Sequence, residues 1–185
     1  MPDGPSNPAD SHEPRGLRGL GEHYLKDLVY GANDGIITTF AVVCGVAGAR
    51  LEPRIVLILG FANLLADGFS MGSSNFLSIR SDEALRRSSG LGVLEPFPGR
   101  HSLATFGAFV VAGVIPLLSY VIIQSGEQFQ VAVILTLVTL FSVGAARCLV
   151  TRAKWWRSGL EMLLVGSIAA AVAYGVGMLL EGVAR

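Results

Sequence analysis

The sequence predicts an all-α integral membrane protein with five transmembrane helices. Hydrophobic residues make up 51% of the 185 positions and charged residues only 15%, whereas a soluble domain carries about 25% charge. The mean hydropathy is +0.56. The apolar residues also gather in runs close to the ~20 residues that cross a bilayer as a helix. We therefore expect one small domain embedded in lipid.

Two regions differ sharply in composition. Residues 1–21 contain four prolines together with Gly, Ser and Asp, so they cannot bury a core and should form a disordered tail. Residues 22–185 should form the five-helix transmembrane domain. Its spans are expected at about 28–49, 55–79, 102–123, 129–150 and 159–180.

Each span has a recognisable boundary. A polar, aromatic stretch at 22–27 leads into the first span, and a short turn with Pro53 begins the second. The polar connector 80–100 carries the loop signals Ser-Ser-Gly and Pro-Phe-Pro-Gly. Pro116 should kink the third span near Gly113, because proline lacks the N–H that a helix interior needs.

The remaining boundaries are a polar turn at 124–128 and a basic loop at 151–158. That loop contains two tryptophans, as is typical of a membrane interface. Most basic residues fall in the tail, the connector and this loop, which an odd number of spans places on one side of the membrane. The positive-inside rule then predicts a cytosolic N-terminus.

Two aspartates lie well inside these spans. Asp34 is in the first span and Asp67 in the second. A carboxylate in hydrocarbon costs roughly 2.5–3.5 kcal/mol on insertion scales, so it normally faces a bundle interior or a wet pathway. Asn63, Asp67 and Met71 follow at spacings of four and should share one helix face. This face is the first candidate functional site.

The chemistry of that face suits a metal ion. Carboxylates offer hard oxygen ligands that also exchange protons, and the thioether of Met71 adds a soft ligand. A mixed oxygen and sulfur environment fits Fe(II) or Mn(II) better than an alkali ion. The alternative is that both aspartates only hydrogen-bond to neighbouring helices, and that Met71 is packing. Gly31-x-x-x-Gly35 and Gly68-x-x-x-Gly72 bracket the aspartates, so the first two helices are expected to meet there.

Other residue types argue against competing functions. The formal net charge is zero, so nothing favours a nucleic-acid partner. His12, His23 and His101 show no ligand spacing, and no catalytic set or nucleotide loop is present, so we expect no enzyme and no bound cofactor. Glu161, at the start of the fifth span, is a secondary candidate for a pathway mouth, as is Asn63. The connector residues Asp82, Glu83 and Glu95 could catch a metal at the cytosolic face, but we interpret this mixed-charge segment as a solvated loop.

Four segments resemble the vacuolar iron transporter (VIT) family. They are VYGANDGIITTFAVVCGVAGA, LADGFSMGSSNFLSIRSDEA, GVIPLL and SGLEMLLVGSIAAAVAYGVG, which together represent nearly all of the chain beyond the tail. The resemblance implies a five-helix homodimer with a pathway along the dimer axis. It also implies export of Fe(II), sometimes Mn(II), from the cytosol in exchange for protons. By motif position, Asp34 and Met71 would be pathway residues; Asp67 is added on physical grounds.

The chain departs from that family's pattern at the connector. Better-known members insert a long, glutamate-rich cytosolic domain there, which gathers metal, and the connector 80–100 is too short to form it. The expected location is a bacterial inner membrane, with a vacuolar-type membrane as the alternative. Two other functions stay open at this point: a membrane-embedded structural or interaction protein without transport, and a transporter of another cation.

Overall fold

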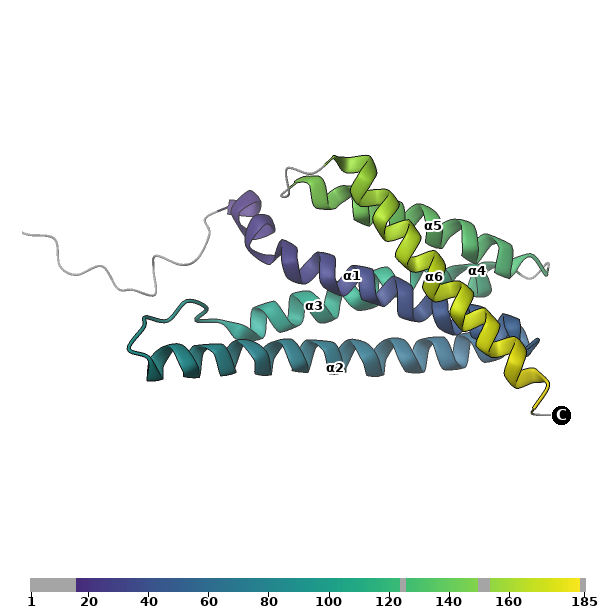
Figure 1. The fold of residues 1–185 in the computed structure, drawn as a ribbon, viewed down its shortest axis with the longest axis horizontal. Helices are drawn as coiled ribbons and strands as arrows, with labels where there is room; N and C mark the ends of the chain where they lie inside the picture. The colour runs from purple at the N-terminus through teal and green to yellow at the C-terminus, as the bar shows by residue number, and fades with distance from the viewer. Residues whose placement is uncertain (1–15, 124–125, 150–153, 184–185) are drawn as a thin grey trace, which may run out of the picture.

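The computed structural model describes residues 16–123, 126–149 and 154–183, and this part of the chain is helical throughout apart from short turns and the connector (Figure 1). The elements in order are α1 (Gly16–Gly48), α2 (Pro53–Ser88), α3 (Pro98–Gly113), α4 (Ile115–Ile122), α5 (Gln128–Ala146), the 3-10 turn η2 (Arg147–Leu149) and α6 (Trp155–Glu181).

Among the described residues, five helical segments are long and apolar enough to cross a membrane, which confirms the predicted number. They are His23–Gly48, Pro53–Ser88, Pro98–Ile122, Gln128–Ala146 and Trp155–Glu181. The third of these joins α3 and α4, which are separated only at Val114. The break confirms the kink expected from Pro116, whose ring would clash with the carbonyl one turn earlier.

The helix ends differ from the expected spans. α1 begins at Gly16, inside the region predicted to be a disordered tail, while residues 1–15 of that tail lie outside the described residues. α5 ends at Ala146, and α6 begins at Trp155, inside the predicted loop 151–158. Residues 151–153 of this loop also lie outside the described part. α2 has 36 residues. At 1.5 Å per residue it is about 54 Å long, well beyond the ~30 Å hydrocarbon layer.

Helix α3 lies between α1 and α2 and is the packing centre for both (Figure 1). A Cβ atom added at Gly35 would lie 2.2 Å from the backbone oxygen of Phe109 on α3. Gly68 and Gly72 also face α3, against Phe106. The glycine motifs thus bring α1 and α2 onto α3. The two helices also contact each other, as expected, but α3 and not the partner helix packs against these glycines.

Apolar side chains form the interior and also much of the outer surface. Phe109, Leu64 and Leu117 are fully buried in the main cluster. Large apolar residues such as Phe69 and Leu179 are more than two thirds exposed on the outside. Because water-soluble monomers rarely expose large contiguous apolar surfaces, this outer layer suits lipid contact.

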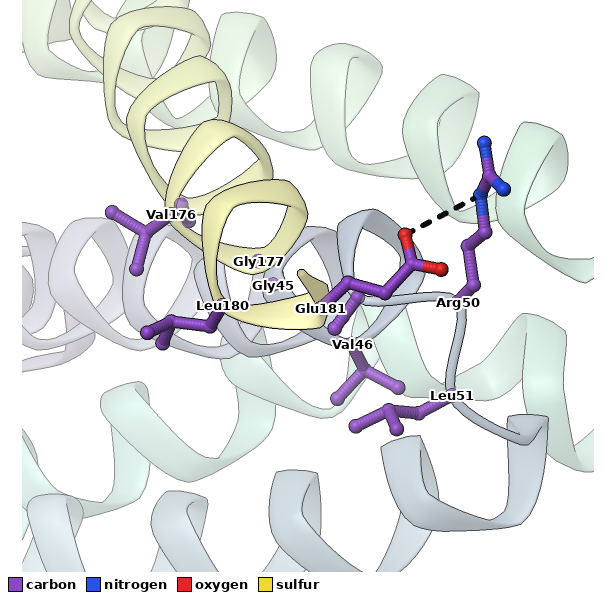
Figure 2. Close-up of a pocket in the computed structure, with 10 residues that line it drawn as sticks. Gly45, Val46, Arg50, Leu51, Val176, Gly177, Leu180 and Glu181 are labelled. Carbon is purple, nitrogen blue, oxygen red and sulfur yellow. Dashed lines mark ion pairs between the residues drawn. The ribbon is translucent and has the colours of Figure 1, made fainter. Parts of the chain in front are cut away.

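The ends of α1 and α6 meet at the end of the bundle opposite the connector (Figure 1). A groove lies between them (Figure 2). It has a volume of about 750 Å³, and apolar residues such as Leu51, Val176 and Leu180 line most of it. Arg50 Nε lies 3.7 Å from Glu181 Oε2 at its rim (Figure 2). The lining offers one carboxylate, already paired with arginine, so this groove does not supply a metal-ligand set.

Candidate functional site

Asp34 and Asp67 come from two helices that contact each other, and the charge of Asp67 acts on Asp34. Asp34 lies on α1 and Asp67 on α2, and each side chain is half-buried. The hydroxyl of Thr38 donates a hydrogen bond of 2.8 Å to the backbone oxygen of Asp34, which leaves the Asp34 carboxylate free of this neighbour. The structure therefore places two of the three main candidate residues on contacting helices.

Asn63 orients one of these carboxylates. Its Nδ2 atom donates to Asp67 Oδ2 over 2.7 Å, one helical turn away on α2. A hydrogen bond to a charged acceptor is worth roughly 1.5–3 kcal/mol, so this contact holds Asp67 in one orientation. Asn63 thus acts as a neighbour that positions Asp67.

Met71 lies one turn beyond Asp67. It is half-buried and packs against the main apolar cluster that contains Leu64 and Phe109. Asn63, Asp67 and Met71 consequently form a half-buried row beside the buried positions Gly60, Leu64, Gly68 and Gly72 of α2. The packing contact agrees with a structural role for Met71, and its incomplete burial leaves the thioether able to face a pathway.

Two further oxygen atoms near Asp34 need an explanation. Among the described residues, Asn33 Oδ1 and Thr39 Oγ1 are buried and have no hydrogen-bond partner. A buried polar atom without a partner costs about 1–3 kcal/mol, so such atoms usually serve a water, an ion or a functional state. Both lie on α1 within five residues of Asp34. They lie on other sides of α1 than Asp34, and Thr39 Oγ1 lies beside Gly113 of α3.

Glu161 is not joined to this group. It lies exposed on α6, and among the described residues it forms no hydrogen bond or ion pair. α6 packs mainly against α1 and α5 rather than α2. The structure therefore places this secondary candidate apart from the two aspartates.

A second group of polar residues was missed by sequence reasoning. His23 and His101 have no ligand spacing along the chain, and Glu95 was interpreted as part of a solvated loop. In the structure one ligand atom from each of these three residues lies within 4.8 Å of the others. The one available signal was that His23 and Asp27 are four residues apart and so share a face of α1.

Comparison with known proteins gives a family match over most of the chain. The sequence model described as the VIT family matches residues 25–92 and 88–178. Vacuolar iron transporter homolog 5 from rice, Oryza sativa subsp. japonica, is 32% identical over 164 residues, covering 83% of this chain and 79% of the relative. Vacuolar iron transporter homolog 4 from Arabidopsis thaliana is 30% identical, covering 82% and 81%.

A third relative shows where lengths differ. Vacuolar iron transporter 1 from Eucalyptus grandis is 27% identical and covers 82% of this chain and 84% of the relative, but its alignment runs over 210 positions. The rice alignment covers the same share of this chain in 164 positions. The eucalyptus protein therefore has additional residues within the aligned region. The two family-model matches overlap at 88–92, in the connector between α2 and α3. This overlap favours the connector as the place of those residues.

Proposed function

The chain belongs to the VIT family, and from that premise we propose that it carries a divalent transition metal across a membrane. Fe(II) is the first substrate and Mn(II) the second, and the metal leaves the cytosol in exchange for protons. The relatives are transporters by name and not enzymes, so the protein moves its substrate without converting it.

The observation that carries this proposal is that Asp34 and Asp67 are both half-buried on two helices that contact each other, near enough for the charge of Asp67 to act on Asp34. Two carboxylates inside spans of this length are expensive unless they serve a cation or each other's hydrogen bonds. Asn63 satisfies only part of the Asp67 carboxylate. With the half-buried thioether of Met71 one turn away, the ligand set combines hard oxygens with a soft sulfur, which suits Fe(II).

Proton exchange follows from the same groups. Carboxylates bind metal in their deprotonated form, so metal binding releases protons and protonation releases metal. A pathway of two aspartates therefore couples metal and proton movement without further machinery. No nucleotide site is needed for such an exchange.

A second copy of the chain would complete the pathway. The small residues Ala62, Ala66, Ser70, Ser74 and Ser78 repeat every four positions on α2, and all are exposed. They lie beside the row that contains Asp67, which in one chain is only half-buried. Small residues allow helices to approach closely in membranes. A homodimer formed through this face covers both aspartates with protein and places the metal pathway along the dimer axis.

The orientation and location complete the proposal. The positive-inside rule places the N-terminus and the α2–α3 connector in the cytosol. The names of the relatives fit the vacuolar-type alternative for the membrane of residence. A bacterial inner membrane remains our prediction from the arginine-rich composition, in which Lys26 and Lys154 are the only lysines.

Transport is tested with purified protein in liposomes. Fe(II) is added outside under anaerobic conditions, with and without an acidic interior, and its entry is followed with a trapped metal-sensitive dye. We expect uptake that the pH gradient accelerates, with Mn(II) competing and Na⁺ having no effect. Equal Fe(II) entry into protein-free liposomes would refute the proposal, and uptake indifferent to pH would refute its proton coupling.

A further inference from the structure

The structure assigns a second metal site to the connector end of the bundle: His23, Glu95 and His101 form a docking site for a divalent transition metal, with Asp27 positioning His101. Its role as the entry to the pathway rests on the proposed function, whereas metal binding itself does not. The site draws on three separate segments, α1, the connector and α3, which meet at this end (Figure 1).

The distances between ligand atoms fit one metal ion. His101 Nε2 lies 3.0 Å from Glu95 Oε2, and His23 Nε2 lies 3.4 Å from the same oxygen. Ligands bound at about 2.0–2.2 Å from a metal lie about 3–3.5 Å from one another in common coordination geometries. The remaining separation within the set is at most 4.8 Å, which side-chain rotation closes.

Asp27 fixes the orientation of His101. Oδ2 of Asp27 lies 2.6 Å from His101 Nδ1, and both residues are buried. Oδ1 of the same carboxylate accepts a 2.8 Å hydrogen bond from Asn75, so Asp27 is itself held from α2. With Nδ1 turned to Asp27, Nε2 of His101, which contacts Glu95 Oε2 at 3.0 Å, is the ring nitrogen left to bind a metal in place of that contact. Protein-bound metals use carboxylate–histidine pairs of this kind to orient their imidazole ligands.

The cluster is open on one side only. The His101 side chain is 8% exposed, whereas those of His23 and Glu95 are 26% and 28% exposed. The Tyr24 ring packs against both imidazoles, with ring centroids 4.8 Å from His23 and 4.7 Å from His101. A hydrated ion can therefore reach the set from the aqueous side, while the inner ligand is already in place. A purely structural salt-bridge network would need Asp27 and His101, but not two further metal-binding groups converging on the exposed face.

The ligand types and the position of the set indicate what it binds. Two histidines with one carboxylate and open positions are the ligand set of Fe(II) sites, and also accept Mn(II) and Co(II). Asp27 precedes Asp34 by seven residues on α1, which is about two turns on the same face and about 10 Å along the axis. The set therefore stands in line with the transmembrane aspartates. It supplies metal capture in a chain whose connector is too short for a separate domain.

The test uses tag-free full-length protein in detergent with His12 replaced by Ala, so that His23 and His101 are its only histidines. Mn(II) is the probe, its affinity is measured by titration, and pulsed electron paramagnetic resonance detects ¹⁴N coupling from coordinated imidazole. We expect ¹⁴N coupling in this protein and also when Asp34→Asn removes the transmembrane site. His23→Ala should weaken Mn(II) binding at least tenfold and reduce the coupling, whereas Glu52→Gln, at the opposite end, should change neither.

Absence of ¹⁴N coupling at saturating Mn(II), or unchanged affinity and coupling in His23→Ala, would overturn the site. His23 is the residue chosen for the main variant because its partly exposed side chain can be removed without opening the core. His101→Ala is also measured, with thermal unfolding as a control for loss of the fold. The two proposals fail separately. Intact ¹⁴N coupling without metal flux in liposomes rejects transport and keeps the site, and metal flux without ¹⁴N coupling rejects the site and keeps transport.

Discussion

His101 Nδ1 on α3 lies 2.6 Å from Asp27 Oδ2 on α1, and this contact joins two segments 74 residues apart in the sequence. It fixes the relative position of the two helices at the connector end. The same contact determines which ring nitrogen of His101 is left for a metal.

Replacing Asp27 by Asn should weaken Mn(II) binding by about 10–100-fold, the usual effect of removing a partner of a metal ligand. An amide at this position can donate to Nδ1, which moves the ring proton to Nε2, the atom that faces the metal. Asp27→Glu should restore part of the affinity. Asp82→Asn, an exposed carboxylate near the same end of α2, is the matched control and should bind normally. A purely structural role for Asp27 would lower thermal stability in Asp27→Asn without changing Mn(II) affinity.

Replacing Gly35 by Ala should destabilise the fold, because the added methyl group would lie 2.2 Å from the backbone oxygen of Phe109. Overpacking of this kind costs about 1–3 kcal/mol, and a backbone atom has little room to move. Gly107→Ala is the matched control: it is also in a helix, but nothing lies within 4 Å of the added atom. Thermal unfolding in detergent should show a lower midpoint for Gly35→Ala only. Equal midpoints would contradict the close packing of α1 on α3.

Replacing Met71 by Leu tests whether Met71 only packs against its neighbours or also binds the metal. The two side chains have similar volume, so the free energy of unfolding should change by less than about 1.5 kcal/mol. Loss of the thioether should nevertheless slow Fe(II) uptake severalfold in liposomes while leaving Mn(II), a harder ion, less affected. If Fe(II) and Mn(II) rates both stay at the wild-type level, Met71 is a packing residue and no pathway ligand.

The exposed small residues of α2 provide a test of the homodimer. In a protein whose Cys44 and Cys148 are replaced by Ala, Ser70→Cys should form a disulfide-linked dimer on mild oxidation in the membrane. Val111→Cys, whose native side chain is 73% exposed on α3, is the control and should remain monomeric. Cross-linking at position 111 but not at 70 would place the interface on another face.

The five spans could be predicted from sequence because membrane insertion depends on local hydropathy alone. The helix ends could not be predicted in this way, because hydropathy indicates where the chain lies in lipid and not where the helix ends. Helix α2, for example, continues through the polar residues Arg80 and Asp82 to Ser88 with its backbone hydrogen bonding unbroken. The helix break near Pro116 could also be predicted, because proline acts on the backbone locally.

The packing partner of each helix and the histidine cluster depend on the tertiary arrangement. Gly31 and Gly35 indicate that a backbone comes close, but not that it belongs to α3. His23, Glu95 and His101 carry no common spacing, and they meet only because the fold brings Glu95 of the connector beside His23 of α1 and His101 of α3. Asp34 and Asp67 were identifiable because their cost in a membrane is a property of each position.

The most direct test of transport through the two aspartates is the initial rate of Fe(II) entry into liposomes that contain either wild-type protein or Asp34→Ala. The liposomes have the same protein content and the same acidic interior. Without one of the two interacting carboxylates, the rate should fall at least about tenfold, which corresponds to about 1.4 kcal/mol on the rate-limiting step. Unfolding midpoints close to the wild-type value would show that the fold is intact. Fe(II) entry through Asp34→Ala at the wild-type rate would contradict the assigned pathway.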